Sequence, residues 1–229
     1  MAQPIDIDPH ERPSLAEIAY RVVQDRLLTL EIRPGDPIND EALARELGCG
    51  RTPVREALKR LELDRLVVTY PRRGTFATPV EVTDLAYISE IRAQLEPLAA
   101  TRAARLASPA ARKQLLSLIH RVREFDVVSA TVAETLAFDA AMHRAIYAAG
   151  GNPHLEDALV RYDNLATRIW CLVMDRLPGL AGHLHEHVAL LQAVVDGDER
   201  QAAELAREHV EGFEVAVRTA LFAPHVSVV

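Results

Sequence analysis

The chain contains 229 residues, of which 33 are acidic and 26 are lysine or arginine, so its formal net charge is −7 at pH 7. This length suffices for two domains with separate cores, and the acidic balance argues against binding nucleic acid over the whole surface. The N-terminus carries no apolar signal segment, and no apolar run approaches the roughly 18 residues of a membrane helix. We therefore expect a cytoplasmic protein with no membrane partner. Cys49 and Cys171 fall in different predicted domains, so we expect no structural disulfide.

The positive charge is concentrated in one stretch. Residues 45–73 contain eight Arg or Lys against four Asp or Glu, a net charge of +4, whereas residues 81–229 contain 14 against 20, a net charge of −6. A local basic footprint in an acidic chain is typical of a protein with one nucleic-acid-binding part.

The first third of the chain predicts short helices followed by a β-hairpin. Ser14 to Glu17 form a capping-box sequence, Asn39 is a suitable N-cap, and Gly48 supplies a left-handed turn. Residues 33–37 contain two prolines and a glycine and predict a turn. After a Pro- and Asp-rich arm over residues 1–13 that is expected to be disordered, the expected elements are helices over 14–30, 40–47 and 52–63 and strands over 66–70 and 75–78.

The helix expected over 52–63 has two distinct faces. Its apolar residues recur at the i, i+3, i+4, i+7 spacing of a buried stripe. Basic and hydroxyl side chains lie on another face or at the N-terminal end, where a recognition helix contacts bases in the major groove. Arg can donate two hydrogen bonds to guanine, and hydroxyls suit phosphates. The stripe is Val54, Ala57, Leu58 and Leu61, and the candidate DNA contacts are Arg51, Thr52, Arg55 and Lys59.

The hairpin expected next carries arginines at its tip. Arg72, Arg73 and Gly74 lie between the two strands, where they suit contact with phosphates or an adjacent minor groove. The basic helix alone has a simpler explanation as an amphipathic helix with a solvated face. Because helix, turn, helix and basic hairpin follow one another within about 40 residues, the pattern favours a winged helix-turn-helix and sequence-specific DNA binding.

The remainder of the chain is helical in pattern. Residues 79–82 form a short linker, and beyond them Ala, Leu and Val recur at helical spacing with breaks at Pro or Gly. Six helices joined by short loops predict an antiparallel bundle, so the fold class is mainly α. The domains are therefore a DNA-binding domain over 14–78 and a helical domain over 83–222 with a tail over 223–229. The expected bundle helices span 83–107, 109–129, 132–149, 153–177, 180–196 and 199–222.

Four residues of the second half form a candidate metal site. Asp139 and His143 are four residues apart and therefore project from one face of an otherwise apolar helix. His187 and His209 lie on two later helices. One carboxylate and three imidazoles that converge inside a bundle suit Zn²⁺, Ni²⁺ or Mn²⁺ and leave coordination positions for water or an anion.

Two alternatives compete with this metal site. Each histidine alone has a simpler explanation as a core or surface residue, and we expect His183 and His185, which flank His187, to be exposed. The other alternative is a metal-dependent hydrolase or isomerase that uses the same cluster. Glu186 is its nearest candidate for a general base, but adjacent helix positions point about 100° apart. An enzyme would also leave the DNA-binding half unexplained.

The run LARELGCGRTPVREALKRLELDRLVVTYPRRGTFATPV resembles the DNA-binding domain of GntR-type bacterial transcription regulators. RTPVREAL and PRRGTF carry most of the resemblance, which covers about residues 14–79. It implies that Arg51, Thr52 and Arg55 make the main base and phosphate contacts and that residues 72–74 form the wing tip.

Three departures from that family pattern affect the expected contacts. Cys49-Gly50 stands where Val-Ser is usual, so Gly50 must cap the recognition helix without a side-chain oxygen. Arg65 stands where the family usually has Gly, so the end of this helix is expected to be less well capped. Glu41 replaces an Arg that contacts DNA in some members, so we expect that contact to be absent.

The second half resembles the FCD effector domain of the FadR-like branch of the same family. The resemblance spans about residues 83–222 and is carried by IRAQLEPLAA from Ile91, by residues 138–143, by Gly151-Asn152-Pro153, and by His187 followed by Gly197-Asp198 and His209. It implies that Asp139, His143, His187 and His209 bind a divalent metal and that Arg92 reaches the effector pocket. A dication, one aspartate and Arg92 together favour a small carboxylate effector. For Arg92 the alternative is a surface ion pair with Glu96.

Both resemblances imply a homodimeric, ligand-responsive regulator, most simply a repressor. A two-fold dimer presents two identical DNA-binding heads and therefore matches a pseudo-palindromic operator. A further alternative keeps DNA binding but makes the metal purely structural, with no small-molecule effector.

Overall fold

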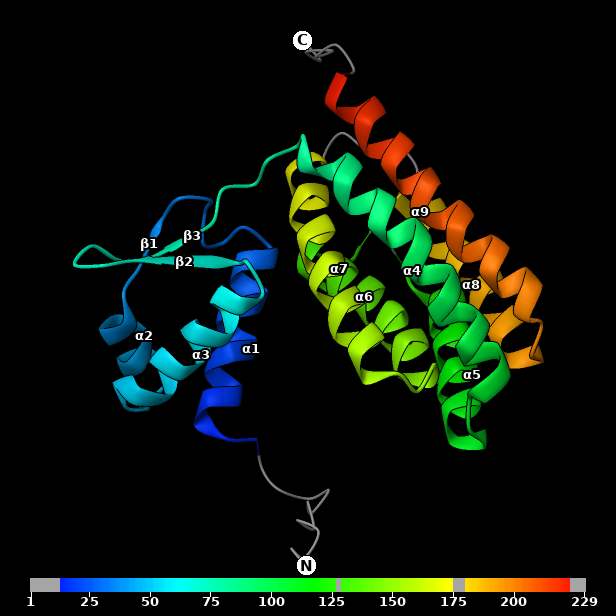
Figure 1. Cartoon of the computed structure of the whole chain (residues 1–229), viewed down its shortest axis with the longest axis horizontal. Helices are drawn as coiled ribbons and strands as arrows, with labels where there is room; N and C mark the ends of the chain where they lie inside the picture. The colour runs from blue at the N-terminus through cyan, green and yellow to red at the C-terminus, as the bar shows by residue number, and fades with distance from the viewer. Residues whose placement is uncertain (1–12, 127–128, 175–179, 223–229) are drawn as a thin grey trace, which may run out of the picture. The chain divides into compact units, whose positions relative to one another are not determined.

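The computed structural model describes residues 13–126, 129–174 and 180–222, apart from the side chains of 180–182 and 222. The expected tail, all but the last residue of the expected arm, and the expected helix end at 177 lie outside these residues. The chain divides into two compact units, one up to Pro79 without Leu28–Leu30, and one with those three residues and everything from Val80. Figure 1 shows the elements of each unit.

The first unit combines three helices with a small antiparallel sheet. The strands lie in the order β1-β3-β2, with Val67 opposite Ala77 and Tyr70 opposite Gly74 in the hairpin. Strand β1 was not expected, because two residues have no periodicity and it is defined by pairing of Pro37 with Phe76. The elements are α1 (Leu15–Leu28), β1 (Pro37–Ile38), α2 (Asp40–Glu46), α3 (Arg51–Leu63), β2 (Val67–Tyr70) and β3 (Gly74–Ala77).

Helix α3 buries the stripe that its sequence predicts. Val54, Ala57, Leu58 and Leu61 are all buried. At its start Gly50 is the N-cap and makes no side-chain capping bond. Asn39, by contrast, caps α2 by accepting hydrogen bonds from the N–H groups of two residues in its first turn.

The end of α3 is a Schellman motif built on a non-glycine residue. Arg65 has φ +61°, in the left-handed region that glycine usually occupies. The N–H of Arg65 donates to Glu62 O at 3.1 Å, and the N–H of Leu66 donates to Leu61 O at 3.0 Å. The cap therefore forms, but a side chain at this position costs conformational energy.

We expect Arg65→Gly to stabilise the first unit. The left-handed conformation costs an L-residue about 1–2 kcal/mol, and part of the gain is offset by the greater freedom of glycine when unfolded. The expected net gain is about 0.5–1 kcal/mol, seen as a higher denaturation midpoint with an unchanged m-value. Gly48→Ala, which places a side chain at φ +61°, is the opposite control and should destabilise. An Arg65→Gly protein with an unchanged or lower midpoint would contradict the strain argument.

The second unit is a bundle of six helices in the described residues. Three of the six have the expected bounds, and α5 ends at Glu124 instead of 129 because Phe125 adopts an extended conformation. Ser108 caps α5, and Thr131 forms a capping box with Glu134 at the start of α6. The helices are α4 (Asp84–Leu106), α5 (Pro109–Glu124), α6 (Val132–Ala149), α7 (Pro153–Val173), α8 (Leu180–Asp196) and α9 (Glu199–Phe222).

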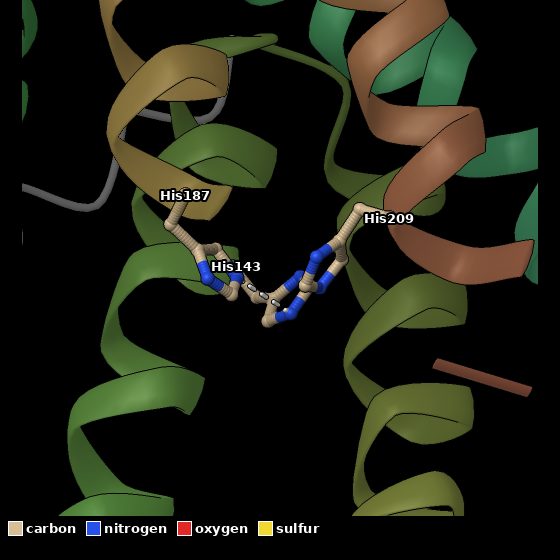
Figure 2. A group of neighbouring side chains, drawn as sticks. All are labelled: His143, His187 and His209. Atoms are coloured by element: carbon tan, nitrogen blue, oxygen red, sulfur yellow. Dashed lines mark hydrogen bonds between the residues drawn. The ribbon is translucent and has the colours of Figure 1, made fainter. Parts of the chain in front are cut away.

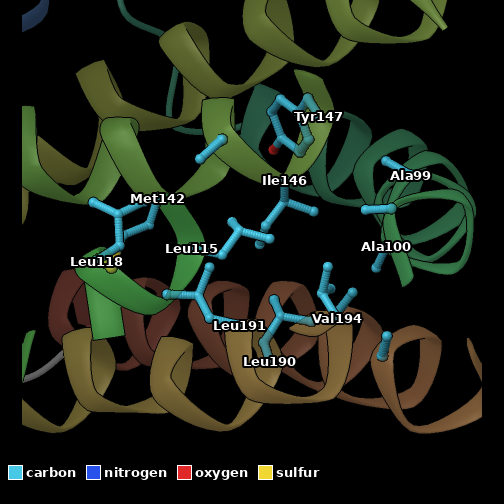
Figure 3. Packing of buried hydrophobic residues seen from close by; sticks show 14 of the residues in the cluster. Ala99, Ala100, Leu115, Leu118, Met142, Ile146, Tyr147, Leu190, Leu191 and Val194 are labelled. Carbon is cyan, nitrogen blue, oxygen red and sulfur yellow. The ribbon is translucent and has the colours of Figure 1, made fainter. Parts of the chain in front are cut away.

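Helix α4 is the central element of this bundle and packs against α6, α7, α8 and α9. Ala99, Ala100 and Ala103 on α4 are fully buried, so neighbouring helices approach it closely. Figure 3 shows Ala99 and Ala100 with Leu115, Ile146 and Val194 in the larger of two apolar clusters. The second cluster combines residues of α4, α6, α7 and α9, including Leu85, Trp170 and Phe213. Among the described residues, no helix has the length and apolar character needed to cross a membrane.

A buried polar layer interrupts the apolar packing of the bundle. On α4, Arg92 and Glu96 follow Ile88 of one cluster and precede Ala99 of the other. On α9, His209 likewise falls between Ala206 and Phe213. Asp139 and His143 on α6, Asp163 on α7 and His187 on α8 are buried as well. The functional residues predicted in the second half therefore lie inside the bundle.

Candidate nucleic-acid interface and metal centre

The basic face of α3 is exposed. Arg51, Thr52, Arg55 and Lys59 all lie at the surface, opposite the buried stripe that fixes the rotation of the helix on its unit. The side chains of Arg51 and Arg55 are 51% and 61% exposed. The face predicted to contact DNA is therefore accessible.

A single carboxylate on α2 holds the two arginines together. Arg51 Nη2 donates to both oxygens of Asp40, at 3.1 and 3.2 Å, and Arg55 Nε donates to Asp40 Oδ2 at 2.7 Å. These hydrogen bonds, of which the one from Arg55 has the largest effect, keep the pKa of Asp40 below its ordinary value. The carboxylate thus aligns two guanidinium groups whose remaining N–H groups stay available to a ligand. No sequence pattern indicates this role of Asp40, because the contact joins two helices.

A groove separates α3 from the wing. It has a volume of about 420 Å³ and is lined by Arg55 and Lys59 on α3 and by Thr69, Gly74 and Thr75 on the hairpin. Arg72, Arg73 and Gly74 are exposed at the tip, where Arg72 has φ +64° and the Arg73 guanidinium lies 5.7 Å from the centre of the Tyr70 ring. Positive charge therefore lies on the α3 side of the groove and at the tip of the wing.

In the second unit, three imidazoles from three helices meet inside the bundle. His143 on α6, His187 on α8 and His209 on α9 are at most 5% exposed. Their ring centres lie 4.3 to 5.2 Å apart, and Figure 2 shows the rings turned toward one another. One ligand atom of each lies within 4.8 Å of the others, a spacing that suits a shared metal ion.

Asp139 adds a carboxylate to the same group. Its Oδ1 lies 3.7 Å from His187 Nε2, and its Oδ2 lies 3.8 Å from His143 Nε2. Oδ1 is buried and has no hydrogen-bond partner among the described residues. Burial raises the pKa of Asp139 to about 7, and a bound cation would favour its ionised form.

These donors fit a divalent metal ion. The Nε2 atoms of His143 and His187 are 3.2 Å apart. Two nitrogens that each bind an ion at about 2.0–2.1 Å are separated by about 3 Å in octahedral and about 3.4 Å in tetrahedral geometry. Burial lowers the pKa of His143 to about 4 and those of His187 and His209 well below the ordinary value. All three rings are therefore neutral at pH 7, the form that binds a metal.

The outward nitrogens of two of these rings have polar partners. His143 Nδ1 lies 3.1 Å from Tyr147 Oη and 3.6 Å from Glu96 Oε2. His209 Nδ1 lies 3.4 Å from Glu186 Oε2. Partners of this kind fix which nitrogen faces a metal. In both rings Nε2 is left for the centre of the group.

Arg92 is buried beside this group, where it forms ion pairs. Its Nε donates to Glu96 Oε1 at 2.6 Å, and its Nη2 lies 3.3 Å from Asp163 Oδ1. Burial opposes the charge of Arg92, but Glu96 and Asp163 raise its pKa above the ordinary value. The ion pair with Glu96 that was the alternative for Arg92 therefore exists, but it is buried instead of lying at the surface, with side chains that are 5% and 2% exposed.

The expectation for His183 is wrong, whereas His185 is exposed as expected. The His183 side chain is 16% exposed, and its ring stacks on His209 with centres 4.5 Å apart and planes at 21°. Its Nε2 lies 3.9 Å from Asp139 Oδ1. The sequence held a usable signal, because His183 is four residues before His187 and shares its helix face, as Asp139 does with His143.

A winged helix-turn-helix joined to a helical sensor domain defines the class of DNA-binding transcriptional regulators. The gntR family of bacterial regulatory proteins matches residues 15–77, and the FCD domain matches residues 87–212. The chain belongs to the GntR family of transcriptional regulators and carries an FCD effector domain. Regulators of this family bind DNA and usually act as dimers with small-molecule effectors, and FCD domains commonly bind metal. The family is one of regulators and not of enzymes, which removes the hydrolase or isomerase alternative.

Known relatives agree with this assignment, and a solved structure agrees with the fold. The Nta operon transcriptional regulator of Aminobacter aminovorans is 28% identical over 188 residues, covering 80% of this chain and 85% of that protein. The transcriptional repressor GlaR of Escherichia coli is 24% identical over 198 residues, covering 83% and 90%. The fold is similar to that of McbR/YncC of E. coli, with a TM-score of 0.76, 20% identity and coverage of 92% and 100%.

We expect Asp40→Asn to lower the specificity of DNA binding. The amide no longer pairs with Arg51 and Arg55, whose orientation is lost, while removal of a negative charge leaves non-specific affinity equal or higher. The ratio of affinities for a duplex selected from a random library and a scrambled duplex should fall roughly tenfold, within the range of one base contact. Both affinities are measured by fluorescence anisotropy at fixed salt. Glu41→Gln, which removes an exposed acid that pairs with Arg45, is the matched control. An unchanged ratio in Asp40→Asn would refute the positioning role.

We expect His187→Ala to remove most of the bound metal. The substitution deletes one of the four candidate donors at a position that is 0% exposed. The loss of affinity should exceed the roughly 10- to 100-fold effect of an outer-shell change. Elemental analysis after dialysis measures the metal, and His120→Ala at an exposed position of α5 is the control. Full occupancy in folded His187→Ala would show that the donors do not act together.

Proposed function

We propose that this regulator is a homodimeric repressor whose operator binding is controlled by a small carboxylate that ligates a metal ion in the FCD domain. The observation that carries the proposal is the convergence of three buried neutral imidazoles and Asp139 from α6, α8 and α9. The repressor role is supported by the related GlaR, which is named as a repressor.

The DNA contacts are assigned to the exposed side chains around the groove of the first unit. Arg51 and Arg55 are placed side by side by Asp40 and are suited to guanine edges or phosphates. Thr52 and Lys59 on the same helix suit phosphates. Arg72, Arg73 and Gly74 at the wing tip suit the neighbouring backbone or minor groove. Two such heads in a dimer would match a pseudo-palindromic operator.

The metal is assigned to Asp139, His143, His187 and His209. Three imidazoles and one carboxylate favour Zn²⁺ or Ni²⁺, with Mn²⁺ as a further candidate. Four protein donors leave room in an octahedral sphere for two more ligand atoms. A bound dication would supply a Lewis-acidic point that attracts anionic oxygen. The protein's own groups orient the donors and keep them dehydrated.

The preference for a carboxylate depends on the metal more than on the protein's charge. Glu96 and Asp163 are buried near Arg92, so these three groups together contribute one negative charge when all are ionised. With Asp139 and a dication, the net charge of the group is about zero, whereas a dication, one aspartate and Arg92 alone would carry a positive charge. Arg92 remains the effector residue in this proposal, through the guanidinium nitrogen that holds neither carboxylate. Its two ion pairs fix the direction of that nitrogen.

The alternative in which the metal is purely structural makes a different prediction, and one experiment separates the two. Metal-loaded and chelator-treated protein are titrated onto the selected duplex with and without a library of small carboxylates. We expect a carboxylate to raise the melting temperature and to weaken operator affinity roughly 5- to 150-fold, only when metal is present. If chelation lowers the melting temperature but no carboxylate changes operator affinity, the metal is structural and the proposed control by effector is wrong.

A further inference from the structure

The side chains beyond the four metal donors form a second, connected group. Glu186 and His183 lie three residues apart on α8, and His209 faces them from α9. One ligand atom of each of these three lies within 4.8 Å of the others. His209 therefore belongs to both groups of possible donors.

One carboxylate oxygen lies close to the Nδ1 atoms of both imidazoles. Glu186 Oε2 lies 3.4 Å from His209 Nδ1 and 3.6 Å from His183 Nδ1. The two rings are stacked nearly parallel, so their Nδ1 atoms face the same oxygen. A carboxylate accepts hydrogen bonds and donates none, so it favours the neutral tautomer of each ring that carries its hydrogen on Nδ1. The lone pair of each ring is then on Nε2.

The Nε2 side of His183 faces Asp139, one of the proposed metal donors. His183 Nε2 is 3.9 Å from Asp139 Oδ1, the oxygen that also lies 3.7 Å from His187 Nε2. Trp170 and Phe213 pack against the His183 ring, with centres 5.1 and 5.5 Å away, and limit its rotation. His183 is thus held with its nitrogen toward the carboxylate that completes the donor set.

We propose that Glu186 is a positioning residue that fixes the tautomers of His209 and His183, and that His183 thereby supplies a further nitrogen donor on the Asp139 side of the metal centre. The inference rests on the metal site of the proposed function and extends its donor set from three to four imidazoles. Because an added nitrogen occupies one coordination position, the effector would then bind through fewer atoms than a four-donor site allows.

The test is a Co²⁺ titration of the metal-free full-length protein, followed by visible absorption spectroscopy. Glu186→Gln should bind Co²⁺ roughly 10- to 100-fold more weakly, the range for loss of an outer-shell partner. Glu186→Asp, which keeps a carboxylate, should recover part of this loss. His183→Phe keeps an aromatic ring but removes the donor, and should change the position and intensity of the Co²⁺ bands because one nitrogen is lost.

Two exposed positions provide controls, and circular dichroism confirms folding of every variant. Glu208→Gln removes the same charge next to His209 on the outer side of α9, and His120→Ala removes a distant imidazole. Both should match the wild type in affinity and spectrum. Wild-type affinity and spectrum in Glu186→Gln would overturn the positioning role, and an unchanged spectrum in His183→Phe would overturn the donor role. A wild-type protein that binds no Co²⁺ would refute the metal site of the proposed function itself.

Discussion

The helical domain is organised around polar groups that are buried and only partly satisfied. Neutral imidazoles and a carboxylate in an apolar bundle are unfavourable unless each polar atom finds a partner. Asp139 Oδ1 has none among the described residues, while the nearby Arg92 is held by two carboxylates. A cation placed between this oxygen and the inward Nε2 atoms would give them a partner. The same cation would make the centre attractive to an anionic effector.

The apolar clusters on either side of this polar layer explain how the bundle orients its donors. Each functional side chain comes from a helix whose rotation is fixed by apolar residues above and below it, such as Ala206 and Phe213 around His209. Donors on three rigid helices can be held closer to their required geometry than donors on loops. The polar partners of the outward Nδ1 atoms of His143 and His209 then set which nitrogen of each ring faces the centre.

The DNA-binding unit solves a different electrostatic problem. It must present several arginines on one face of a chain that is acidic overall. Asp40 lies between Arg51 and Arg55 and neutralises part of their mutual repulsion, while both arginines stay more than half exposed. Positive charge is therefore ordered as well as concentrated, which favours specific contacts over general attraction to phosphate. The left-handed Arg65 shows that α3, which carries this face, keeps its C-terminal cap despite the missing glycine.

The sequence alone determined the helices, their caps and their buried faces, because local residue patterns encode these features. Apolar spacing and caps predicted the helices of both units, including α6, α8 and α9 with their observed bounds, and the buried stripe of α3. The i, i+4 pair Asp139 and His143 was enough to predict an inward donor face. Tertiary structure alone decided which distant residues meet: β1 on β3, Asp40 on two arginines, Asp163 on Arg92, and Glu186 between His183 and His209. Such contacts depend on how helices rotate and pack against one another, and no repeat within a single segment records that.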